Sequence, residues 1–178
     1  MPMILRALRH TPIGTLEDAA GTLAGVAACF ADSIGGLWTQ VHGQHVSITT
    51  ATAEFVLEVS RIHPDRRRTG GPTHHVPLVA RPGQGRVGAC TIRVVPNEPG
   101  ETAFDLRASL EAPVFHLDPE ALLALTSTVA DAMAADEACL RPEAWANGPA
   151  SWAVLARAAA VGHGSVSRRC GVSPLYGA

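Results

Sequence analysis

The sequence predicts an α+β domain: an antiparallel sheet with an N-terminal helix and a long helix packed on one face, followed by short C-terminal helices. Apolar residues recur at helical spacing over residues 15–33 and again over 118–138. Between residues 37 and 110 the spacing changes to two, and turn residues recur. A chain of 178 residues is long enough for one core. We therefore expect an α+β domain over 15–140 and a separate appendage over 149–170.

The first helix is expected over residues 15–33. Thr15 is placed to cap it, and Asp18 follows three residues later, close to capping-box spacing. An apolar stripe then follows, made by Leu16, Ala19, Ala20, Leu23, Ala27 and Phe30. The pair Gly35-Gly36 ends the segment.

The strands are expected from alternation and from the turns between them. The first two, 37–41 and 45–50, flank a turn at residues 42–44. Residues 55–59 alternate and are expected to form a third strand or to continue the second. Residues 75–79 are expected at an edge because Pro77 lacks an N–H group. The strands 87–95 and 103–110 flank a turn at 97–100, which predicts an antiparallel hairpin.

The triplet Asp118-Pro119-Glu120 is the clearest helix start. Aspartate caps, proline takes the first helical position, and glutamate favours the positive end of the helix dipole. The helix is expected to reach about Ala138 before Arg141-Pro142 breaks it. Its predicted buried face is Leu122, Leu125, Val129, Ala132 and Met133.

Composition indicates a cytoplasmic protein without a membrane segment. The N-terminus lacks the long apolar region of a signal peptide, and no run approaches the length of a membrane span. The four cysteines, Cys29, Cys90, Cys139 and Cys170, are far apart and share no metal-binding or redox spacing. The net charge of −2 gives no overall attraction to nucleic acid.

The segment 149–170 has the spacing of two short helices across a tight turn. Ser151 is placed as an N-cap, and Trp152, Leu155, Ala156 and Ala159 fall on one helical face. Gly162 and Gly164 interrupt the helix, and a second short run begins at Val166. This is the outline of a helix-turn-helix. The alternative is an alanine-rich helix that packs against the sheet or a partner.

The run Leu155-Ala-Arg-Ala-Ala-Ala-Val-Gly-His-Gly-Ser-Val-Ser-Arg168 resembles the helix-turn-helix of lactose-repressor-type transcription factors. The small residue of that motif is matched by Ala156, and its apolar anchors by Val161 and Val166. The resemblance implies that residues of the recognition helix face DNA, here His163, Ser165, Ser167 and Arg168. No acidic residue follows Glu143, whereas Arg157, Arg168 and Arg169 do, which favours phosphate contact.

A second group of candidate phosphate contacts is Arg66, Arg67 and Arg68. They lie in the longest expected loop, beside Gly70-Gly71, where arginine side chains and exposed amides are suited to bind phosphate. A solvated loop tip is the alternative interpretation.

Sequence motifs for catalysis, cofactors or metals are not found. The chain has no Gly-x-Ser-x-Gly motif and, because it has no lysine, no Gly-x-x-x-x-Gly-Lys phosphate loop. His42 and His45 lack the further ligands that zinc needs. His116, among Asp105, Glu111 and Asp118, is the remaining candidate for an oriented imidazole. We therefore expect a DNA-binding or transcription-regulatory accessory protein, arranged as a homodimer on duplex DNA. The alternative is a non-enzymatic protein–protein interaction module.

Overall fold

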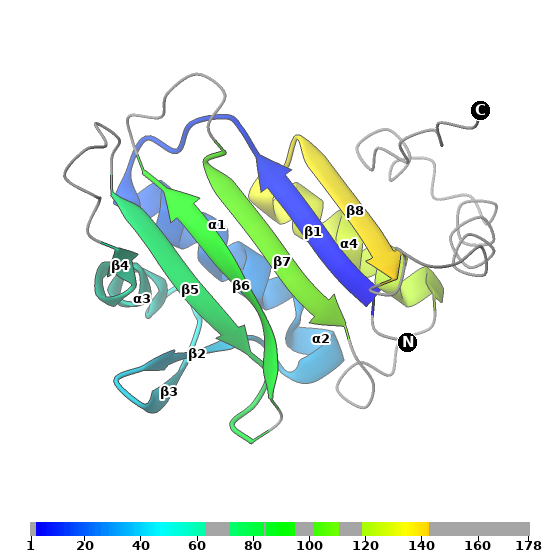
Figure 1. The fold of residues 1–178 in the computed structure, drawn as a ribbon, viewed down its shortest axis with the longest axis horizontal. Helices are drawn as coiled ribbons and strands as arrows, with labels where there is room; N and C mark the ends of the chain where they lie inside the picture. The colour runs from blue at the N-terminus through cyan, green and yellow to red at the C-terminus, as the bar shows by residue number, and fades with distance from the viewer. Residues whose placement is uncertain (1–2, 63–71, 84, 95–101, 111–118, 143–178) are drawn as a thin grey trace.

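The computed structural model describes residues 3–62, 72–83, 85–94, 102–110 and 119–142. In these residues an antiparallel sheet of eight strands packs against four helices, so the predicted α+β fold is confirmed (Figure 1). In chain order the elements are β1 (Met3–Arg9), α1 (Leu16–Cys29), α2 (Ala31–Ile34), β2 (Trp38–Val41), β3 (Gln44–Ser47), α3 (Ala53–Val59), β4 (Arg61–Ile62), β5 (Thr73–Val79), β6 (Arg86–Arg93), β7 (Phe104–Leu110), α4 (Pro119–Met133) and β8 (Glu137–Pro142).

The strand order across the sheet is β3-β2-β5-β6-β7-β1-β8, with the short β4 pairing with β5. The strand β1 lies between β7 and β8, with Leu5 opposite Ala108 on one side and Leu140 on the other. All three side chains are buried. The sequence pattern predicts neither β1 nor β8. The sheet thus begins at Met3, before the start expected for the packed domain.

The helices α1 and α4 cover one face of the sheet, behind the strands in Figure 1, and α3 packs against α1 and β5. Strand residues that point toward this face are buried, as in β7, where Phe104, Leu106, Ala108 and Leu110 alternate with more exposed neighbours. The helices α1 and α4 pack closely, because an added Cβ at Gly25 would lie 3.8 Å from the Ala132 side chain. The core is built mainly from small aliphatic residues, with Phe30 and Phe104 as its largest fully buried side chains.

The predicted helix starts agree with the structure. Thr15 caps α1, and its hydroxyl accepts a hydrogen bond from the Asp18 amide at 3.0 Å. The helix α4 begins at Pro119, as the proline at the first helical position predicts. Within α4, Leu125, Val129 and Met133 are buried as expected.

The prediction of a strand at residues 55–59 is wrong, because they belong to the helix α3. Its buried positions, Ala53, Val56 and Leu57, have helical spacing, while Phe55 stays exposed. The Thr52 hydroxyl accepts a hydrogen bond from the Thr49 amide at 2.9 Å and stabilises the turn before the helix. The run Phe-Val-Leu-Glu-Val fits both spacings, and only the packing decides between them.

The long helix ends earlier than predicted, at Met133 rather than about Ala138. Ala134 has a φ of 49°, in the left-handed region, so the chain leaves the helix there. It then returns as β8, whose Ala138 and Leu140 fill the core beside β1.

Two features near β5 complete the sheet. The expected turn between β2 and β3 is present, with positive φ at His42 (49°) and Gly43 (82°).

The expectation that β5 is an edge strand is wrong, since β6 pairs along one side and β2 and β4 pair near its two ends on the other. Pro77 is accommodated between those two end pairings, where no hydrogen bond from its nitrogen is required.

Candidate functional site

The residues predicted to contact DNA or phosphate all lie outside the described residues. They are Arg66, Arg67, Arg68, Arg157, His163, Ser165, Ser167, Arg168 and Arg169. Those assignments therefore stay predictions. His116, the candidate for an oriented imidazole, also lies outside the described residues. Asp105, one of the acids expected around it, forms an ion pair with Arg6.

The face of the sheet opposite the helices is covered by no described helix, and Figure 1 looks directly onto it. We call this surface the open face and define it by the outward residues of β1, β6, β7 and β8. They are Ile4, Arg6, Leu8, Arg86, Ala89, Thr91, Arg93, Asp105, Arg107, Ser109, Glu137 and Cys139. Each is partly or fully exposed. An antiparallel sheet with one solvated face is stable by itself, so exposure alone assigns no role.

Charge is divided between the helices and the strands. The four helices carry the acidic residues Glu17, Asp18, Asp32, Glu54, Glu58, Glu120 and Asp131 and no arginine. The strands carry the arginines Arg6, Arg9, Arg61, Arg86, Arg93, Arg107 and Arg141, against only Asp105 and Glu137 as acids. Among the strand arginines, Arg9 donates to the Met133 carbonyl on the helix side. The open face itself holds Arg6, Arg86, Arg93 and Arg107 against Asp105 and Glu137, so it is basic, although the whole chain has a formal net charge of −2.

A hollow lies on the open face where β6 bends. The register between β5 and β6 shifts so that Leu78 faces Gly88 while Val79 faces Arg86, which leaves Val87 as an extra residue. A Cβ on Gly88 would collide with the main chain of β7, so only glycine permits this approach of the strands. The hollow has a volume of about 480 Å³. It is lined by Ile4, Arg86, Val87, Gly88, Ala89, Arg107 and Ser109.

Two arginines, Arg86 and Arg107, line this hollow without a carboxylate partner among the described residues. The ion pairs found there join Arg6 to Asp105 at 3.1 Å and His10 to Glu137 at 3.3 Å. Arg86 donates from Nε to the Gly88 carbonyl at 3.3 Å. Guanidinium groups present planar sets of donors that suit carboxylates and phosphates. The hollow is thus suited to an anionic group.

Arg6 is less available than its neighbours on the open face. Its guanidinium donates through both Nε and a terminal nitrogen to the Asp105 carboxylate, and this hydrogen bonding raises the pKa of Arg6. Arg107 is directly opposite Arg6 in the pairing of β1 with β7. The Asp105 carboxylate therefore offsets one of two adjacent positive charges and leaves the other to solvent.

A second, smaller cleft opens where β2 and β4 diverge along β5. Its volume is about 350 Å³. The polar side chains in its lining are Gln40, His42, Ser60, Arg61 and His75, and the lining holds no acid. The Ser60 hydroxyl already donates to the Val56 carbonyl at 2.5 Å, and the His75 amide donates to the Ser60 carbonyl at 3.0 Å. Ser60 therefore serves the fold through both its side chain and its main chain.

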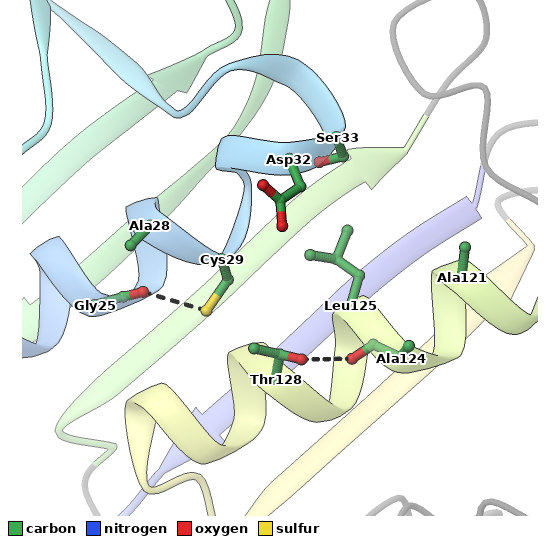
Figure 2. Close-up of a pocket in the computed structure, with 9 residues that line it drawn as sticks. All are labelled: Gly25, Ala28, Cys29, Asp32, Ser33, Ala121, Ala124, Leu125 and Thr128. Atoms are coloured by element: carbon green, nitrogen blue, oxygen red, sulfur yellow. Dashed lines mark hydrogen bonds between the residues drawn. The ribbon is translucent and has the colours of Figure 1, made fainter.

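A third cleft, of about 600 Å³, lies on the helix side between α1, α2 and α4 (Figure 2). Its two central polar groups bond within their own helices. The Cys29 thiol donates to the Gly25 carbonyl at 3.2 Å, and the Thr128 hydroxyl donates to the Ala124 carbonyl at 2.9 Å. Burial raises the pKa of Cys29, which disfavours the reactive thiolate. We interpret this cleft as a gap between helices with small side chains.

His74 is the one buried histidine among the described residues, with an exposed fraction of 2%. Its Nδ1 atom lies 2.6 Å from the Leu57 carbonyl, so a proton on Nδ1 makes it the donor and ties β5 to α3. Burial lowers the pKa of His74. The neutral form is therefore favoured, and Nε2 has no hydrogen-bond partner among the described residues. His74 acts as a structural residue in this position.

The open-face arginines are not predicted from the sequence, although part of the signal is present. In β7, Arg107 alternates with the inward Leu106 and Ala108, so its outward direction follows from the strand period. Its proximity to Arg86 and Arg6 follows only from the strand order. That order places β1 beside β7, and no local sequence pattern predicts this pairing.

Searches of protein-family models, of curated proteins and of solved structures find no match to this chain. In the described part of the chain, no three histidine, cysteine or carboxylate groups converge to hold a metal ion. Among the same residues, no helix combines the length and apolarity needed to span a bilayer. Functional inference therefore rests on the geometry and charge of the open face.

Proposed function

We propose that this chain is a binding module whose open sheet face contacts an anionic partner. The observation that carries the proposal is the pair Arg86 and Arg107, which flank a hollow of about 480 Å³ on the uncovered side of the sheet. Neither side chain is paired with a carboxylate among the described residues. The acidic helices lie on the other side, so an anionic partner would be favoured at one face only.

The experiment measures binding of labelled duplex DNA and of a labelled acidic polypeptide by fluorescence anisotropy at several salt concentrations. The double variant Arg86→Gln/Arg107→Gln removes two cations from the hollow. If both contact DNA phosphates, the slope of log affinity against log salt concentration falls in magnitude by about 2. An acidic polypeptide that occupies the hollow should lose affinity in the same variant.

The matched control is Arg61→Gln/Arg81→Gln, which changes the net charge equally. Arg61 lines the separate cleft beside β5, and the Arg81 guanidinium lies against Gly35, after α2. We expect this control to change affinity much less. Equal losses in the two double variants would mean that only net charge matters, and the proposed surface would then be rejected.

A second candidate is duplex DNA binding through residues 149–170, as the helix-turn-helix resemblance implies. The observation that favours it is the absence of any acid after Glu143, together with Arg157, Arg168 and Arg169. The variant Arg168→Gln/Arg169→Gln should abolish selective DNA binding while Arg86→Gln/Arg107→Gln retains it. The triple variant Arg66→Gln/Arg67→Gln/Arg68→Gln tests the loop contact in the same titration, and an unchanged salt slope would remove that loop from the interface.

A further inference from the structure

The strand β8 ends the sheet on one side. It pairs with β1, and no described strand pairs with its other side. It has six residues, whereas β3, the outer strand at the opposite end, has four. A long outer strand exposes main-chain donors and acceptors that another strand can pair with. The question is which groups face outward and what they fit.

The neighbouring hydrogen bonds fix the orientation of β8. The Leu8 carbonyl accepts from the Asp136 amide at 2.8 Å, so the main-chain groups of Leu8 face β8. Main-chain direction alternates along a strand, and Leu8 and Arg6 are opposite Glu137 and Cys139. The N–H and C=O groups of Glu137 and Cys139 therefore face β1. Those of the alternate residues, Ala138 and Leu140, face away from the sheet.

We propose that β8 pairs antiparallel with β8 of a second copy of this chain, about a two-fold axis at Cys139. Ala138 then forms a hydrogen-bonded pair with Leu140 of the second copy, and the symmetry repeats this pair. Moving the axis to Leu140 would place Ala138 opposite Pro142, which has no N–H to donate. Moving it to Ala138 would place Leu140 opposite Asp136, whose amide already donates to Leu8.

The charges of β8 fit the same register. With the axis at Cys139, Glu137 is opposite Arg141 of the second copy, and this pair also occurs twice. Oppositely charged residues directly across an antiparallel pair stabilise it, whereas like charges destabilise it. The segment Glu-Ala-Cys-Leu-Arg is thus complementary to its own reverse. This self-complementarity identifies the partner as a second copy rather than an unrelated strand.

A two-fold axis that relates two antiparallel neighbours runs perpendicular to the sheet. The two open faces would therefore lie on the same side of one continuous sheet, with the helices of both copies behind it. The dimer does not depend on the proposed anionic partner. It would place two copies of the Arg86–Arg107 hollow on one surface.

The first test is disulfide cross-linking through Cys139 in a Cys29→Ser/Cys170→Ser background. In the proposed register Cys139 is opposite itself in a non-hydrogen-bonded pair, with Cα atoms about 4.5 Å apart, within reach of a disulfide. Mild oxidation with copper–phenanthroline should give a covalent dimer. The control Glu137→Cys/Cys139→Ser moves the thiol two residues from the axis, so the two thiols are too far apart to join.

The second test is sedimentation equilibrium of charge variants over a range of protein concentrations. We expect Glu137→Arg or Arg141→Glu alone to weaken self-association about tenfold. The double swap Glu137→Arg/Arg141→Glu restores opposite charges and should recover it. This recovery separates the dimer contact from the ion pair that Glu137 makes with His10. A chain that stays monomeric without a Cys139 cross-link, equal cross-linking at position 137, or a dimer indifferent to the swap would each overturn the proposal.

Discussion

The two faces of the sheet, one covered by helices and one open, are formed by the same strands but carry different side chains. Inward residues such as Leu5, Ile92 and Leu106 are fully buried under the helices. Outward residues on the same strands, such as Arg93 and Arg107, are charged and at least partly exposed. The inward side therefore determines stability, while the outward side can change charge at little cost to the fold. Substitutions on the two sides should separate these properties.

The largest effect on stability is expected at Gly88, where β6 approaches β7 most closely. The substitution Gly88→Ala adds a Cβ that collides with the Arg107 carbonyl oxygen and the Ala108 Cα. We expect a loss of about 3 kcal/mol in the free energy of unfolding, measured by urea denaturation. The control is Gly21→Ala, in an exposed part of α1 with no atom within 4 Å of the added Cβ, which should stabilise by up to about 1 kcal/mol. Equal effects at the two glycines would contradict the close approach of β6 and β7.

A pH-dependent effect is expected from His74 on the inward side. Because burial lowers its pKa in the folded state, the unfolded chain binds a proton at a higher pH than the folded chain does. Stability should therefore fall as the pH drops below about 6.5, with a slope of at most about 1.4 kcal/mol per pH unit from this group. The variant His74→Asn keeps a donor near the Leu57 carbonyl and should have a smaller slope between pH 7.5 and 5. An identical slope in the variant would assign the pH dependence to other groups.

A smaller loss of stability is expected at the start of α1. The substitution Thr15→Ala removes the hydroxyl that accepts from the Asp18 amide at 3.0 Å. The cost should be about 1 kcal/mol in the free energy of unfolding. Thr15→Ser, which retains the hydroxyl, is the matched control, and its free energy of unfolding should fall by only a few tenths of a kcal/mol. A similar loss in both variants would show that the methyl group matters more than the cap.

The smallest effect on stability is expected for the Arg6–Asp105 pair on the open face. The two side chains are 46% and 37% exposed, so solvent screens their interaction. A double-mutant cycle with Arg6→Gln and Asp105→Asn should give a coupling energy below about 0.5 kcal/mol. The coupling energy from the same cycle should be larger when the affinity for the anionic partner is measured, because Asp105→Asn frees the Arg6 guanidinium beside Arg107. Coupling above about 2 kcal/mol in stability would show that the open face is less solvated than its exposure indicates.

The sequence predicts the helix starts and the β6–β7 hairpin because their signals are local. Thr15 lies three residues from the amide it accepts from, and Phe104 to Leu110 alternate within one strand. The segment 55–59 is predicted wrongly because its five residues fit both the strand period and the helix period. The burial of Val56 and Leu57 in the core selects the helix. Local patterns are sufficient where one element decides the outcome.

The remaining strands and the open face depend on distant pairings. The strand β1 is defined by its pairing with β7 and β8, which place Ala108 and Leu140 on either side of Leu5. The end of α4 depends in the same way on β8, which uses residues that would otherwise extend the helix. Arg86 and Arg107 become neighbours only because β6 pairs with β7 beside a bulge. No spacing in the sequence encodes that proximity.

In the described part of the protein, acidic helices lie behind the sheet and the arginines Arg6, Arg86, Arg93 and Arg107 lie on the open face, so charge is separated across the sheet. Because the formal net charge is only −2, we expect this separation to influence the orientation of the protein near a charged body more than its net charge does. Near a negatively charged body the protein would rotate before contact, so that collisions begin with the strands. The rate of productive encounters should consequently fall steeply as added salt shortens the range of the field.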